Sequence, residues 1–84
     1  MKRERLLAAL DEFRRNPAGV RFRDLVRVCD ACFGEPRHGS GSHRVYRTPW
    51  PGDPRVNIQY ARGMAKAYQV RQVILAVERL ENMQ

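Results

Sequence analysis

Cysteine is scarce in this 84-residue sequence, which contains two. Two cysteines are too few for the disulfide framework of a small secreted domain. No apolar run approaches the roughly 20 residues that span a bilayer, and the run from Leu6 to Leu10 is too short for a signal peptide. We therefore expect a cytoplasmic protein that forms one domain over residues 1–84 and has no membrane partner.

Acidic residues are nearly absent from the middle of the sequence. Residues 36–72 contain seven basic side chains and one acidic side chain, Asp53, so this segment carries +6 of the net charge of +7. Fourteen of the sixteen basic residues are arginine, whose planar guanidinium suits the geometry of phosphate. This pattern indicates a surface that faces a polyanion. A solvated basic face that keeps the protein in solution is the alternative.

The spacing of apolar residues divides the sequence into helices, strands and turns. Helical spacing covers residues 2–15, 22–33 and 68–82. Strand-like alternation covers residues 43–48 and 55–60, and a weak first strand is expected near residues 33–37. Turn or loop residues cover 38–42, 49–54 and the basic segment 62–67. This order, α-α-β-β-β-α, predicts an α+β fold in which helices pack on one face of a three-stranded antiparallel sheet.

Cys29 and Cys32 form a C-x-x-C pair late in the second expected helix. A redox-active thiol needs a lowered pKa, usually at a helix N-terminus, whereas the C-terminal end of a helix disfavours the thiolate. Both residues fall on the apolar stripe, which favours packing in the core. A zinc site with His38 and His43 is the alternative, but five residues separate Cys32 from His38 where a C2H2 finger uses about twelve. We therefore expect no metal and no cofactor.

His43 is the candidate catalytic residue because it opens an expected strand among arginines. An imidazole is available in both protonation states near neutral pH. RNA carries its own nucleophile, the 2′-OH, so a histidine that removes this proton beside phosphate-neutralising arginines can cleave a strand without metal. Gly41 and Ser42 would shape the approach to His43. A strand-end histidine that its neighbours satisfy is the alternative, and His38 is expected to be an exposed loop residue.

Further side chains are expected to hold the RNA. Some flank the candidate histidine, and others surround the start of the last helix, where backbone amides favour phosphate. Aromatic rings stack on bases, so Tyr46 and Trp50 are candidates for stacking on RNA. The alternative for Tyr46 is packing in the core, and the alternative for Trp50 is covering the edge of the sheet. The expected RNA-binding residues are Arg37, Ser42, Arg44, Tyr46, Arg47, Arg62, Lys66 and Arg71.

Three separated motifs resemble those of HicA-type mRNA interferase toxins. Residues 41–46, GSHRVY, resemble the signature G-S-H-H-x-[YF]. Residues 16–25, NPAGVRFRDL, resemble the opening N-P-x-x-V-x-F-x-D-L. Residues 62–72, RGMAKAYQVRQ, resemble G-G-K-A-K-P-Y-Q-V-R-Q. The resemblance extends over about residues 3–80.

The resemblance implies a fold like that of a double-stranded RNA-binding domain and a metal-independent endoribonuclease that cleaves mRNA in the bacterial cytoplasm. It also implies a type II toxin–antitoxin system with a role in stress response, His43 as the catalytic histidine, and a HicB-type antitoxin that masks it. Arg44 stands where the signature has its second histidine, and Ala67 stands where proline is usual. Arg44 favours one alternative, a catalytically silent RNA-binding module. A subunit whose basic face meets an acidic protein is another.

Overall fold

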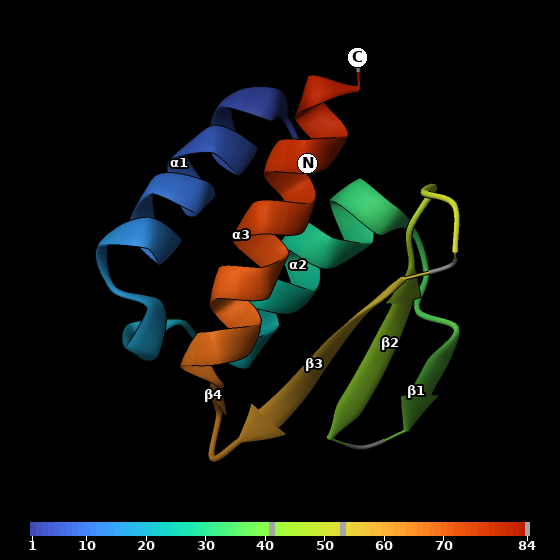
Figure 1. Cartoon of the computed structure of the whole chain (residues 1–84). Helices are drawn as coiled ribbons and strands as arrows, with labels where there is room; N and C mark the ends of the chain where they lie inside the picture. The colour runs from blue at the N-terminus through green and yellow to red at the C-terminus, as the bar shows by residue number, and fades with distance from the viewer. Residues whose placement is uncertain (41, 53, 84) are drawn as a thin grey trace.

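The computed structural model places two helices against one face of an antiparallel sheet and a further helix outside them (Figure 1). It describes residues 1–40, 42–52 and 54–83, with only the backbone of residues 38–40. In chain order the elements are α1 (Arg3–Arg15), η1 (Pro17–Gly19), α2 (Phe22–Phe33), β1 (His38–Ser40), β2 (His43–Arg47), β3 (Arg55–Ala61), β4 (Met64–Ala65) and α3 (Ala67–Asn82). The predicted α+β class and the order α-α-β-β-β-α are confirmed, with the two-residue strand β4 as an addition.

The first strand lies later in the chain than predicted. Residues 33–37 do not form it, because Phe33 is the last residue of α2 and Gly34 ends the helix with a positive φ of 80°. Strand β1 instead covers residues 38–40, which were predicted to be part of a turn, and it pairs with β2 through His38 opposite Val45. Glycine and serine have weak strand propensity, so this strand owes its position to pairing with β2.

The segment 62–67, predicted to be a basic loop, contains the two-residue strand β4. Ala61 pairs with Met64, which leaves Arg62 and Gly63 as a two-residue hairpin loop. Both have positive φ, 54° and 83°, as a type I′ turn requires. The strand order in the sheet is β1-β2-β3-β4.

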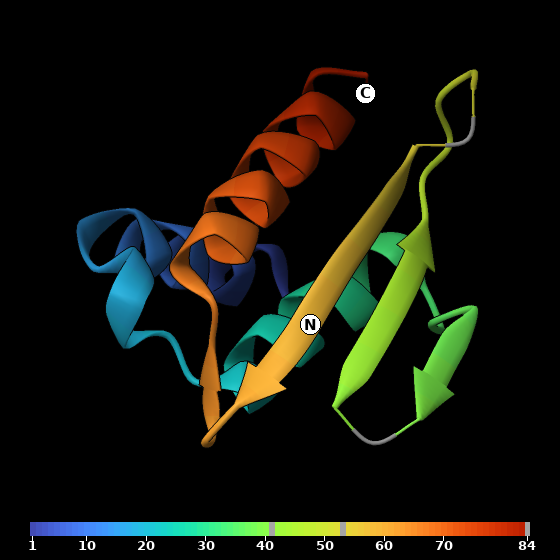
Figure 2. The ribbon, with the colours of Figure 1, turned by 60° about the horizontal axis from the view of Figure 1, so that its bottom comes forward.

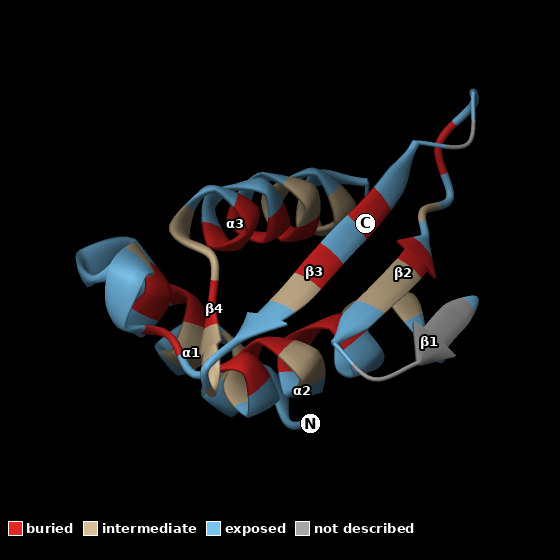
Figure 3. Cartoon of the chain, turned by 90° about the horizontal axis from the view of Figure 1, so that it is seen from below, coloured by how far each residue is buried: buried red, intermediate tan, exposed pale blue. Residues whose placement is uncertain are grey.

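The sheet has a buried face and an open face, because side chains alternate along each strand. Tyr46, Val56 and Ile58 point to the buried face, which α2 and α3 cover. His43 and Asn57 are exposed on the other face. The alternation is visible along β3 in Figure 3, and Figure 2 shows α2 and α3 beside the strands.

The core fills the space between the buried sheet face and the helices. It contains the expected stripe residues Leu10, Phe13, Leu25, Cys29, Val70, Val73 and Val77, and also Val28, which was not expected. Helix α1 packs against α2 and α3. No helix in the described part of the chain combines the length and apolar composition needed to cross a membrane.

Candidate nucleic-acid interface

His43 begins β2 and is exposed on the open face of the sheet. Its Nδ1 lies 3.3 Å from the hydroxyl oxygen of Ser42. This contact orients the imidazole and leaves Nε2 as the nitrogen that can meet a ligand. When Nδ1 carries the proton and donates it to Ser42, Nε2 presents a lone pair, which is the form that a general base requires.

The end of the sheet that contains His43 also gathers the hairpin after β3 and the starts of two helices (Figure 1). The backbone N–H of Tyr60 donates to the carbonyl of Ser42 over 2.7 Å, so the end of β3 lies beside the start of β2. The hairpin residue Arg62 follows, and Lys66 immediately precedes α3. The structure thus brings His43, Ser42, Arg62 and Lys66 to one end of the molecule.

Two arginines that sequence analysis did not assign lie at the same end. Arg21 forms an isolated β-bridge with Met64, and the N–H of Phe22 donates to the carbonyl of Gly63 over 3.0 Å. These contacts place Arg21 and Arg23, at the start of α2, beside the β3–β4 hairpin. We use the term basic end for Arg21, Arg23, His43, Arg62 and Lys66. Arg21 and Arg23 lie in a part of the sequence where basic and acidic residues nearly balance. The charge of that part therefore gave no sign that these two arginines belong to a basic surface.

Acidic residues of α1 and α3 form ion pairs away from the basic end. Arg3 contacts Glu81 at 2.6 Å and Arg14 contacts Glu78 at 2.8 Å, which joins α1 to α3. Two further pairs lie within α1: Arg14 with Asp11 and Arg15 with Glu12. No residue of the basic end forms an ion pair with another described residue. Its positive charge is therefore left to face a ligand.

Tyr46 does not contribute a stacking surface. Its side chain is fully buried, with 0% of its surface exposed, and its hydroxyl donates to Asp30 over 2.7 Å. Burial, together with this hydrogen bond, raises the pKa of Tyr46. The predicted RNA contact of Tyr46 is therefore wrong, and the alternative, packing in the core, is confirmed.

Arg44 leaves β2 on the face opposite to that of His43, because it pairs with the fully buried Ile58. Its side chain is half-buried, and its Nε is a buried donor without a hydrogen-bond partner among the described residues. The structure therefore does not place Arg44 beside His43 on the open face.

The other expected arginines lie at different places around the molecule. Arg47 ends β2 and pairs with Arg55 on β3, four residues from His43, or about 13 Å along the strand. Arg37 is exposed and precedes β1. Arg71 lines a hollow with Arg14 and Pro17 on the side of α3 that faces α1 and η1. None of these three residues belongs to the basic end.

The cysteines pack in the core as predicted. Cys29 is fully buried and Cys32 packs against the core. Burial raises the pKa of both thiols. Within residues 1–40, 42–52 and 54–83, no three His, Cys, Asp or Glu residues are grouped so as to hold a metal ion. Gly41, which was predicted to shape the approach to His43, and the side chain of His38 are outside the part of the chain that the structure describes.

Trp50 closes the end of the molecule opposite to the basic end. It is 8% exposed, meets the edge of Phe33 at a centroid separation of 6.5 Å, and lies under the guanidinium of Arg79 at 4.4 Å. Its indole N–H donates to the sulfur of Met83 over 2.7 Å. Trp50 therefore covers the core rather than stacking on a base.

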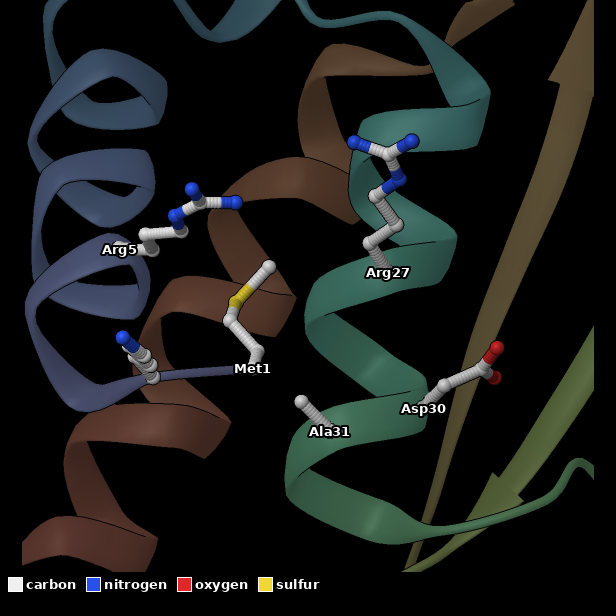
Figure 4. Close-up of a pocket in the computed structure, with 6 residues that line it drawn as sticks. Met1, Arg5, Arg27, Asp30 and Ala31 are labelled. Atoms are coloured by element: carbon white, nitrogen blue, oxygen red, sulfur yellow. The ribbon is translucent and has the colours of Figure 1, made fainter.

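A hollow between α1 and α2 contains no expected site residue. Figure 4 shows Arg5 extending from α1 into this space, with Arg27 on α2 beyond it. Asp30 points from α2 toward the sheet (Figure 4), where it meets Tyr46. A smaller hollow lies at the basic end, between the start of α2 and the β3–β4 hairpin.

No family model, curated protein or solved structure matches this chain. Its site is therefore defined by its own geometry. The defining features are an exposed histidine oriented by a serine and, at the same end of the sheet, basic side chains that form no ion pair within the described residues.

Proposed function

We propose that this protein is a HicA-type toxin of a bacterial type II toxin–antitoxin system, acting in the cytoplasm as a metal-independent endoribonuclease on mRNA. The observation that carries the proposal is the exposed His43, whose Nδ1 is held by Ser42 at the basic end. The three sequence motifs described above support it. The α+β architecture is compatible with a fold like that of a double-stranded RNA-binding domain.

The proposed reaction uses the RNA as its own nucleophile. Nε2 of His43 accepts the proton of a 2′-OH, and the 2′-oxygen attacks the adjacent phosphorus while the bond to the 5′-oxygen breaks. The leaving oxygen takes a proton from His38, from Lys66 or from water. The products are a 2′,3′-cyclic phosphate and a 5′-hydroxyl. Arg62 and Lys66 stabilise the negative charge that develops on the phosphate.

A HicB-type antitoxin is the proposed protein partner. Its role would be to cover His43 and the basic end, because a partner bound there keeps RNA from both the imidazole and the cations. Such a partner would present acidic groups, since the basic end forms no ion pair with other described residues. Charge complementarity of this kind speeds association and suppresses wrong partners.

Cleavage by the purified protein tests the proposal. Wild type and His43→Ala are incubated with an end-labelled RNA, and the new ends are mapped by primer extension. The wild type should produce discrete cuts with 2′,3′-cyclic phosphate ends, and His43→Ala should be about 10²–10⁴-fold slower. The control is Arg15→Gln, which removes a charge from α1 and should retain cleavage. Equal rates for wild type and a folded His43→Ala variant would overturn the mechanism.

The second candidate is a catalytically silent RNA-binding module. Arg44 favours it, because this residue replaces the second histidine of the signature and its side chain leaves the strand on the buried face. This candidate predicts that the folded wild type binds RNA, produces no new RNA ends and does not arrest growth when induced in a bacterial host.

A further inference from the structure

The hollow at the basic end is lined by residues that, apart from Arg62, take no part in the proposed catalytic step. It is bounded by the start of α2, the end of β3 and the hairpin that follows. Its volume is about 480 Å³, within the range of small-ligand sites. The lining residues are Arg21, Phe22, Arg23, Tyr60, Arg62, Gly63 and Met64. Three of these seven are cationic and none is acidic, which fits an anionic ligand.

Tyr60 offers an aromatic surface to this hollow. Val56 and Ile58, which precede it on the same side of β3, are buried, whereas Tyr60 is 48% exposed. Its ring meets that of the buried Phe22 at 84°, with centroids 5.6 Å apart. This edge contact fixes the ring of Tyr60 while leaving much of it open. A fixed and open ring is the platform on which a nucleic-acid base stacks.

Arg62 occupies a backbone conformation that its side chain disfavours. It is the one non-glycine residue with a positive φ in the described part of the chain. The first position of a type I′ loop ordinarily holds asparagine, aspartate or glycine. An arginine there carries conformational strain, and such strain is often found at binding sites. Its position puts a cation at the rim of the hollow, two residues from Tyr60.

Backbone hydrogen bonds hold the walls of the hollow together. Phe22 donates to Gly63 over 3.0 Å, and Ala65 donates to Val20 over 2.9 Å. The hollow is therefore formed before a ligand arrives, which lowers the entropic cost of binding. The backbone N–H of Tyr60 also donates to the carbonyl of Ser42 over 2.7 Å, so the hollow adjoins the strand that carries His43.

We propose that this hollow binds one nucleotide of single-stranded RNA, with its base stacked on Tyr60 and the flanking phosphates held by Arg21, Arg23 and Arg62. The inference rests on the proposed function, since the RNA is the substrate of the same site. The nucleotide in the hollow would fix which neighbouring phosphate reaches His43. An acidic protein would match the charge, but RNA matches both the charge and the open ring.

Photocrosslinking locates the base. The probe is a 12-nucleotide oligouridylate that carries 5-iodouridine, and the protein is His43→Ala, which keeps the RNA intact. Trypsin releases residues 56–62 as one peptide, VNIQYAR, in which Tyr60 is the only aromatic residue. The crosslink should be found on this peptide. A crosslink confined to other peptides would overturn the proposal.

Fluorescence anisotropy with the same oligouridylate measures how much Tyr60 and Arg62 contribute to RNA affinity. In the His43→Ala background, Tyr60→Ala should weaken binding about 10-fold, whereas Tyr60→Phe should retain it. Arg62→Asn should weaken binding without lowering the melting temperature, because asparagine tolerates the left-handed conformation. The matched control Arg15→Gln removes one charge from α1 and should change affinity less than 2-fold.

The outcomes separate this inference from the proposed function. RNA cleavage by wild type together with unchanged affinity in Tyr60→Ala overturns the nucleotide site and leaves the nuclease. Crosslinking to Tyr60, together with no RNA cleavage by the folded wild type, supports the nucleotide site and overturns the nuclease. If decaglutamate binds as tightly as the oligouridylate and Tyr60→Ala weakens neither, the hollow serves an acidic protein and the RNA proposal fails.

Discussion

The hydroxyl of Tyr46 donates a 2.7 Å hydrogen bond to the carboxylate of Asp30, joining the middle of β2 to the C-terminal half of α2. Tyr46 is fully buried, whereas Asp30 is exposed. The bond therefore satisfies a polar group in the core with an acceptor that remains partly in water. It links the sheet to α2.

Tyr46→Phe should lower the free energy of unfolding by about 1.5–3 kcal/mol, the range for a hydrogen bond to a charged group. Urea denaturation measures the change. Tyr60→Phe is the matched control, because the Tyr60 ring is half-exposed, and its effect should stay within about 0.5 kcal/mol. Equal stabilities for Tyr46→Phe and wild type would show that the hydrogen bond contributes nothing.

Stability should fall as the pH rises above about 9. Burial raises the pKa of the Cys29 and Cys32 thiols above their ordinary value of 9.0, and the pKa of Tyr46 above its ordinary value of 10.0. In this range the unfolded chain releases protons that the folded chain retains, and the difference lowers the free energy of unfolding by up to ~1.4 kcal/mol per group and pH unit. Below about pH 8 the folded and unfolded states both hold nearly all of these protons, so these groups cause almost no slope there.

Urea denaturation at pH 7.5, 9, 10 and 10.5 checks this dependence. Cys29→Ala removes one of the three groups and should flatten the decline between pH 9 and 10, even though it lowers stability at every pH. A decline of the same steepness in this variant would show that the Cys29 thiol does not titrate as its burial implies.

Trp50→Ala should lower the free energy of unfolding by about 3–5 kcal/mol, because it removes a large buried ring that joins α2, the β2–β3 connection and α3. Trp50 is the only tryptophan, so its fluorescence reports unfolding in the wild type, and circular dichroism reports it in the variant.

Arg79→Gln is the control that keeps the Trp50 ring in place. It should lower the free energy of unfolding by about 0.5–1 kcal/mol through the lost cation–π contact. RNA binding by a folded Arg79→Gln variant should equal that of wild type.

Gln69 completes the hydrogen bonding of β3. Strand β4 has two residues and its pairing reaches only as far as Tyr60, so the N–H of Gln59 donates instead to the side-chain oxygen of the buried Gln69, over 2.7 Å. Gln69→Ala should therefore lower the free energy of unfolding by about 1–3 kcal/mol. Gln69→Glu keeps the acceptor and should cost less than Gln69→Ala. Gln72→Ala, at an exposed position of the same helix, is the control.

Arg44→His tests whether the second histidine of the HicA signature acts beside the first. Because residues 43 and 44 leave β2 on opposite faces, the new imidazole should not reach the phosphate at Nε2 of His43, and the cleavage rate should change less than about 3-fold, or under 1 kcal/mol in the barrier. A rise of 10-fold or more in cleavage by Arg44→His would show that the two faces of the strand serve one active site.

Features set by nearby residues were predictable from the sequence. The bounds of α2 were predicted correctly, because an apolar stripe ends at Phe33 and a glycine follows. Strand β1 was displaced, because its glycine and serine acquire extended structure only by pairing with β2. The alternation along β2 was clear, but which face the helices cover depends on tertiary packing. Tyr46 was therefore assigned to the wrong face.

The candidate site was predictable only in part, because some of its residues meet only through tertiary contacts. His43, Ser42, Arg62 and Lys66 were expected from motifs and local charge. Arg21 and Arg23 were not, because they reach the basic end through a bridge to Met64, more than forty residues away in the chain. A contact of that range leaves no local pattern in the sequence.

Trp50 and the basic end lie at opposite ends of β3 (Figure 1). The seven residues of that strand span about 20 Å, and effects of substitutions this far apart usually add. The effects of substitutions in the two regions on the free energy of unfolding should therefore add. One consequence is evolutionary: the chain can gain or lose thermal tolerance through the residues around Trp50 while the ligand preference of the other end drifts independently.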